Sequence, residues 1–153
     1  MKRILFSCLG TSDPVRGTHD GPMLHILRHY RPEKVVAFLT PEIADYEAQD
    51  HRFEKARQWI NEHWGGYAPD FRFITLDVKN VHDIDALDQP LCEAMAQLSR
   101  EEPEAEILVN VSSGTPQMGV YTGKFPTIPV GNSTVQFTGN ITKLTIQGRW
   151  RYL

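Results

Sequence analysis

The sequence has little cysteine, no long hydrophobic run and no excess of positive charge. Its two cysteines, Cys8 and Cys92, are too few for a disulfide framework and suit a reducing compartment. No apolar run is long enough to cross a bilayer or to form a signal peptide. The net charge of −3 argues against a broad basic surface for long nucleic acid, and Trp59 and Trp64 are expected to pack against the protein rather than to stack on bases. These absences predict a cytoplasmic protein with no membrane or long nucleic-acid partner, and they leave room for a short polyanion at a local site.

Several catalytic signatures are also missing. Gly10 is not followed by the further glycines of a dinucleotide fingerprint, and no Walker A lysine follows a glycine-rich loop. Ser112 and Ser113 do not stand in the G-x-S-x-G pattern of a nucleophile elbow. His25 and His29 have the spacing of a helical metal site, but the glutamate of a zinc-protease helix and a cysteine cluster are absent. The sequence therefore disfavours nicotinamide enzymes, P-loop enzymes and α/β-hydrolases, and it predicts no metal and no cofactor.

Apolar strands alternate with amphipathic helices through most of the chain. The 153 residues are 41% hydrophobic and 23% charged, which is ordinary for one soluble domain. Strands are predicted at residues 3–9, 34–39, 71–76 and 106–111, and helices at residues 20–31, 40–63 and 84–100. This alternation predicts an α/β fold, with a Rossmann-like, mostly parallel sheet flanked by helices and joined by right-handed crossovers.

The helix boundaries carry recognisable signals. Asp20 is expected to cap the first helix and Thr40 the second, because each precedes a proline in the first turn. The second helix is expected to run without a break to about His63. Pro90 is expected to separate an initial turn from the main part of the third helix, and Asp83 to accept hydrogen bonds from its first N–H groups.

The pattern changes after Met118. Residues 119–153 contain several glycines and prolines and cannot form a long helix. They are expected to form a loop and an atypical C-terminal β-hairpin, with strands at 134–138 and 141–146, packed on the α/β domain of residues 1–118.

Two polar loops follow predicted strands. The first strand ends in Gly10–Pro14 (GTSDP), and the fourth is followed by a stretch, Asn110–Met118 (NVSSGTPQM), that is rich in hydroxyl groups. Because parallel strands end at the same edge of a sheet, the two loops are expected to face each other across a switch-point crevice. Hydroxyls and free N–H groups there would suit a phosphorylated ligand. The alternative is that both loops are ordinary polar turns.

These segments, taken in order, resemble a known family. The motifs that carry the resemblance are Ile4–Ser7, Gly10–Pro14, Asp20–Pro32, Lys34–Val36 and Leu108–Met118. In combination they are similar to the CARF domain (CRISPR-associated Rossmann fold) of the ancillary ribonucleases of type III CRISPR systems, over roughly residues 1–118.

The resemblance implies a sensor of cyclic oligoadenylate, either the tetra- or the hexa-adenylate ring, bound across the two-fold axis of a homodimer. A symmetric site of hydroxyls and N–H donors suits a ring of phosphates. The ligand-binding residues implied by position are Gly10, Thr11, Ser12, Asp13, Ser112, Ser113, Gly114, Thr115 and Gln117.

Two other readings follow from the same resemblance. Some CARF domains cleave their ligand without metal, by in-line attack of a ribose 2′-hydroxyl, and Thr115 is the residue expected to assist in such a ring nuclease. The family also carries a HEPN ribonuclease domain after the sensor, for which this chain is expected to have no room. That departure leaves open a truncated remnant of a CARF–HEPN ribonuclease.

Overall fold

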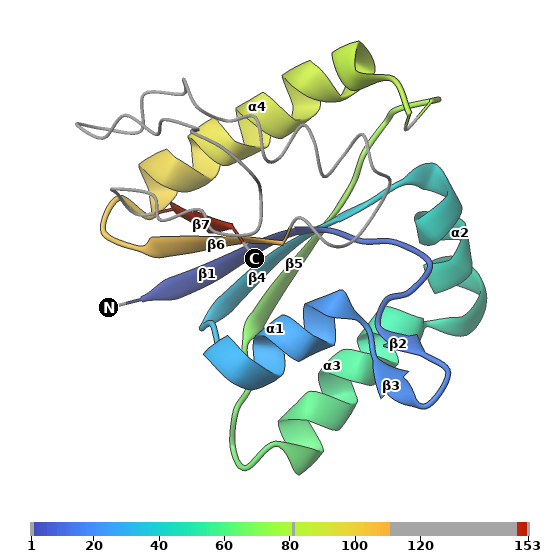
Figure 1. The fold of residues 1–153 in the computed structure, drawn as a ribbon, viewed down its shortest axis with the longest axis vertical. Helices are drawn as coiled ribbons and strands as arrows, with labels where there is room; N and C mark the ends of the chain where they lie inside the picture. The colour runs from blue at the N-terminus through green and yellow to red at the C-terminus, as the bar shows by residue number, and fades with distance from the viewer. Residues whose placement is uncertain (1, 81, 111–149, 153) are drawn as a thin grey trace.

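A five-stranded parallel sheet forms the centre of the computed structural model, which describes residues 2–80, 82–110 and 150–152 (Figure 1). Its strands, in spatial order β5-β4-β1-β6-β7, are Asp70–Thr75, Lys34–Leu39, Arg3–Cys8, Glu106–Asn110 and Trp150–Tyr152. A short antiparallel ribbon, β2 (Val15–Arg16) with β3 (His19–Asp20), follows β1. The predicted Rossmann-like α/β fold is confirmed.

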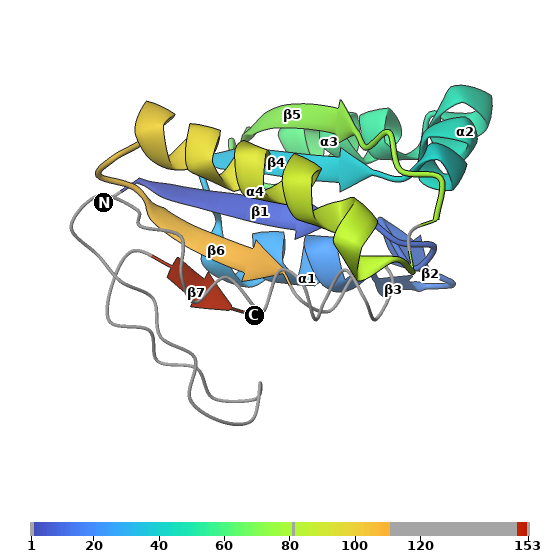
Figure 2. The ribbon, with the colours of Figure 1, turned by 90° about the horizontal axis from the view of Figure 1, so that it is seen from above.

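Helices cover both faces of the sheet (Figures 1 and 2). Helices α1 (Pro22–Tyr30), α2 (Pro41–Asp50) and α3 (Arg52–His63) lie on one face, and α4 (Ile84–Glu101) lies across the other. Because both faces are covered, β1 and β4 are buried at every position after the first, as in other parallel sheets. The side chains of β1 alternate between two apolar clusters, so that Ile4 and Phe6 pack under α4 while Leu5 packs under α1 and α3.

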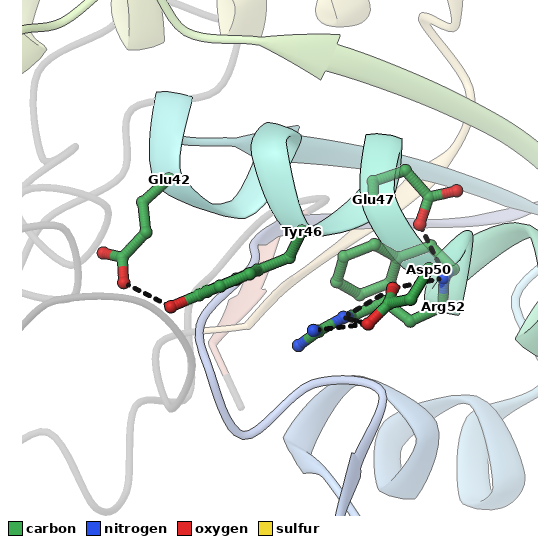
Figure 3. Close-up of polar contacts among 6 residues, drawn as sticks. Glu42, Tyr46, Glu47, Asp50 and Arg52 are labelled. Carbon is green, nitrogen blue, oxygen red and sulfur yellow. Dashed lines mark hydrogen bonds and ion pairs between the residues drawn. The ribbon is translucent and has the colours of Figure 1, made fainter.

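The single helix predicted for residues 40–63 is wrong, because the chain breaks at His51. His51 adopts a left-handed conformation, with φ of 53°, and separates α2 from α3. The break leaves backbone N–H groups at the start of α3 without helical partners, and two acidic side chains accept hydrogen bonds from them. Glu47 accepts from Phe53 N at 2.8 Å, and Asp50 accepts from Arg52 N at 3.1 Å (Figure 3). The start of α2 is confirmed, since Thr40 Oγ1 accepts from Ile43 N at 3.3 Å.

The expected division of α4 at Pro90 is also wrong. The helix is continuous from Ile84 to Glu101 with Pro90 inside it. An interior proline costs about 3 kcal/mol, whereas Leu87 and Leu91 on either side of it are completely buried and each contributes about 2 kcal/mol. Burial on both sides of Pro90 therefore outweighs the lost hydrogen bond. The predicted cap is confirmed, because Asp83 Oδ1 accepts from Ala86 N at 3.3 Å.

The far end of the chain contributes a strand that the sequence did not indicate. Trp150–Tyr152 pairs in parallel with β6, with Leu108 opposite Arg151. A three-residue strand is too short to show a hydrophobic period. The predicted hairpin strands at 134–138 and 141–146 lie outside the described residues. Among the helices that the structure does describe, none combines the length and hydrophobicity needed to span a bilayer.

Candidate ligand site at the carboxyl edge of the sheet

The carboxyl ends of β1 and β6 lie side by side at the centre of the sheet. Their register places Asn110 opposite Ser7, and Asn110 Nδ2 donates to Ser7 Oγ at 2.9 Å in the interior. The chain leaves β1 toward the α1 face and reaches β6 from α4 on the opposite face (Figure 2). This reversal is the switch point at which open α/β sheets bind ligands. The second predicted loop begins directly after Asn110, and its residues Ser112, Ser113, Gly114, Thr115 and Gln117 lie outside the described residues.

The loop after β1 is a tight turn that presents hydroxyl groups. Asp13 N donates to Gly10 O at 3.1 Å, which closes a four-residue turn with Thr11 and Ser12 at its centre. Thr11 is exposed, and Ser12 and Gly10 are half-buried. Three of the four predicted binding residues of this loop therefore have atoms that reach the surface.

Asp13, the fourth predicted residue, is placed differently. Only 1% of its surface is exposed, and its carboxylate joins two segments: Oδ2 accepts from Gly10 N and Oδ1 from Met23 N, both at 3.0 Å. Met23 is the second residue of α1, so the carboxylate also satisfies a free N–H at the positive end of that helix. The geometry therefore assigns Asp13 to holding the loop against α1 and leaves Thr11 exposed and Ser12 half-buried.

The predicted cap at Asp20 is wrong. Gly21 occupies the N-cap position of α1 and provides no side chain, while Asp20 forms an ion pair with Arg28, with Nε and Oδ2 2.7 Å apart. This pair raises the pKa of Arg28. Asp13 supplies the carboxylate in its place from ten residues before Met23. The sequence around the helix start could not predict the bond from Met23 N to Asp13, because it forms only when the loop folds back on α1.

Gly21 is the closest point of contact between the loop and α1. Its N–H donates to Pro14 O at 2.8 Å, and a Cβ atom at this position would lie 2.1 Å from Ser12 O. Its φ is an ordinary −70°, which any residue can adopt. Glycine is required because there is no space for a Cβ atom. The turn Gly10–Pro14 is thus fitted against α1 with no room for a side chain between them.

Other reactive groups near the site are occupied or buried. Burial raises the pKa of the Cys8 thiol, at the end of β1, to about 12, so it stays protonated and unreactive at neutral pH. The rings of His25 and His29 contact each other edge to face, with centroids 4.4 Å apart. Within residues 2–80, 82–110 and 150–152, no group of three or more metal-binding side chains occurs. In this part of the chain the site offers hydroxyls and N–H groups.

Comparisons with known proteins match this description. The family model of the Cas_Csm6 CARF domain matches residues 70–138. The CRISPR system endoribonuclease Csm6 of Mycobacterium tuberculosis is 44% identical over 117 residues, which are 75% of this chain and 26% of that protein. The Csm6 of Enterococcus italicus is 39% identical over 123 residues, 76% of this chain and 27% of that protein. The chain thus spans about a quarter of the length of these relatives.

A solved structure shows the same fold. The chain resembles Enterococcus italicus Csm6 bound to cyclic hexa-2′-fluoro-hexa-dAMP, with a TM-score of 0.66 and 34% sequence identity. The match covers 79% of this chain and 29% of that one. The similarity therefore supports the same parallel α/β fold for most of this chain.

Proposed function

Since this chain carries a CARF domain similar to that of the Csm6 endoribonucleases, we propose that it binds a cyclic oligoadenylate at the carboxyl edge of β1 and β6. The observation that carries the proposal is the turn Gly10–Asp13, which places the exposed Thr11 and the half-buried Ser12 at the switch point and is fixed by a buried carboxylate. The similar structure of Enterococcus italicus Csm6 contains a cyclic hexa-adenylate analogue, which supports this class of ligand.

The proposed site is completed by a second copy of the chain. A cyclic ligand with rotational symmetry fits a two-fold axis, on which each copy contributes the same loop. Thr11 and Ser12 would donate hydrogen bonds to phosphates from the first loop. Ser112, Ser113, Gly114, Thr115 and Gln117 are proposed to do so from the second, with Gly10 approaching the ring through its backbone. Asp13 would act indirectly, by fixing the orientation of the turn.

Titration calorimetry with the cyclic tetra- and hexa-adenylate rings tests this proposal, with linear hexa-adenylate as the control ligand. We expect one ring to bind per two chains, together with a doubled mass in light scattering. Absence of binding by both rings would overturn the proposal. Substitution Thr11→Ala should weaken binding about tenfold, the effect of losing a hydrogen bond to a charged group.

Thr75 offers a matched control on the same edge of the sheet. It is an exposed threonine at the end of β5, which lies two strands away from β1. Thr75→Ala removes the same hydroxyl outside the proposed site and should leave the affinity unchanged. Equal effects of the two substitutions would remove the β1 loop from the site.

The same preparation tests ring cleavage, for which Thr115 is the predicted residue. The bound ring is incubated with a chelator and the products are separated by chromatography. Linear products that disappear in Thr115→Ala would support a ring nuclease, and an intact ring after long incubation would exclude one. Binding and cleavage are measured separately, so failure of the second leaves the first standing.

A further inference from the structure

A hollow lies behind the β1 loop, between α1, α3 and the β2–β3 ribbon. We call it the α1–α3 hollow, and it has a volume of about 540 Å³, within the usual range for small-molecule sites of roughly 300–1,000 Å³. Its floor consists of Leu24, Ile60 and Trp64, each at most 8% exposed. Asp13 and Pro14 of the loop form part of the wall, but Gly10, Thr11 and Ser12 do not line the hollow.

The walls contain apolar side chains that the fold leaves in solvent. Val15 and Trp59 line the hollow and are 52% and 59% exposed. Within the described part of the chain, the other exposed large hydrophobic side chain is Phe73, which is less exposed, at 36%. The expectation that both tryptophans pack against the protein holds for Trp64, whereas one face of Trp59 stacks on His63 with ring centroids 3.7 Å apart. Exposed apolar groups gathered at one cavity indicate a ligand or partner.

The charges at the rim are balanced except at one position. Arg28 is paired with Asp20, and Arg52 with Asp50, with shortest distances of 2.7 and 2.6 Å. Figure 3 shows the second pair, in which both carboxylate oxygens of Asp50 accept hydrogen bonds from the guanidinium group of Arg52. Lys55 lines the same hollow and is exposed. Its positive charge helps to lower the pKa of Asp50. Its amine forms no hydrogen bond or ion pair with any residue that the structure describes.

We propose that the α1–α3 hollow binds a flat aromatic molecule that carries one negative charge. The aromatic group would lie on the apolar floor between Val15 and Trp59, and its anionic group would pair with Lys55. Arg28 already lies over the Trp64 ring, 4.4 Å from its centroid, which shows that the floor accepts a planar cation–aromatic stack. The charges of Arg28 and Arg52 are already neutralised by Asp20 and Asp50. A second negative charge on the ligand would therefore have no cation to pair with among these rim residues.

Indole-3-acetate and indole-3-ethanol provide the test, because they share one ring system and differ in charge. Binding is followed by saturation-transfer NMR and by chemical-shift changes of the Trp59 indole N–H. We expect the anion to bind about three- to fivefold more tightly than the alcohol, the effect of one exposed ion pair. In Lys55→Met the two affinities should become equal, and in Trp59→Ser both should fall.

Phe73→Ser is the matched control, since it removes an exposed aromatic side chain on β5, outside the hollow. It should leave both affinities unchanged. Absence of binding, or binding that is indifferent to Lys55→Met and Trp59→Ser, would overturn the proposal. So would a dimer that dissociates in Val15→Ser while neither indole binds, because the hollow would then be a contact between two copies. The probes contain no nucleotide, so this result is independent of the adenylate titration.

Discussion

The β1 loop and the α1–α3 hollow share Asp13 and Pro14, but different interactions stabilise them. The loop depends on buried bonds between a carboxylate and backbone N–H groups and on a close contact at Gly21. The rim of the hollow depends on exposed ion pairs such as Asp20–Arg28. A buried group that loses its partner costs its full desolvation energy, whereas an exposed pair contributes little. Substitutions in the β1 loop should therefore lower the stability of the protein strongly, whereas substitutions at the rim of the hollow should change it little.

The largest effect is expected at Gly21. Gly21→Ala would place a Cβ atom 2.1 Å from Ser12 O, so the turn or α1 must shift. We expect the free energy of unfolding to fall by about 3 kcal/mol or more, measured by urea denaturation. Gly17→Ala is the control, because Gly17 has φ of +61° but open space around it. It should lose only about 1 kcal/mol, from backbone conformation. Equal losses would show that the close contact does not matter.

Asp13 should come next. Asp13→Ala leaves the N–H groups of Gly10 and Met23 without this acceptor in the interior, and we expect a loss of roughly 2–4 kcal/mol. Asp13→Asn keeps one acceptor oxygen and should lose about half as much. The comparison with the exposed rim is Asp20→Asn, which should cost under about 1 kcal/mol. If Asp13→Ala is as mild as Asp20→Asn, the carboxylate does not hold the loop.

The hydrogen-bonded pair of Ser7 and Asn110, at the ends of β1 and β6, should show an intermediate effect. Ser7→Ala removes the hydroxyl that accepts from Asn110 Nδ2, and both side chains are at most 1% exposed. We expect about 1–2 kcal/mol in urea denaturation. Ser7→Cys keeps a weak acceptor of similar size and should recover part of the loss. Full recovery would indicate that the space, and not the hydrogen bond, determines the effect.

The smallest effect is expected at the rim. The hydrogen bonds from Arg52 lower the pKa of Asp50, so their contribution is present above the ordinary pKa of a carboxyl group and is lost as pH falls through the lowered value. Arg52→Ala should return the pKa of Asp50 toward its ordinary range in an NMR titration between pH 2 and 6. The midpoint of thermal unfolding at pH 7 should change little, since both side chains are still partly in solvent. A large loss at pH 7 would contradict the contrast with the loop.

Local signals in the sequence account for most of the fold. The apolar runs at Arg3–Cys8, Lys34–Leu39 and Glu106–Asn110 are strands, and proline after Thr40 marks the start of α2, as predicted. The failures occurred where a particular hydrogen bond or the burial of a neighbouring side chain decides the outcome. The helix through His51 breaks because Glu47 and Asp50 can satisfy the freed N–H groups, and α4 continues through Pro90 because Leu87 and Leu91 are buried. Neither balance can be read from propensity alone.

The sequence by itself determined the parallel α/β alternation, the position of the β1 loop and its resemblance to CARF domains, because these depend on hydrophobic period and short motifs. Only the tertiary structure decided what the polar residues do. It left Thr11 exposed and Ser12 half-buried, and it buried Asp13 between Gly10 and Met23. It also placed Val15 and Trp59 in one hollow with Lys55, whose amine has no ion-pair partner among the residues that the structure describes. Burial and partnership depend on which segments meet in space, and the fold alone brings these segments together.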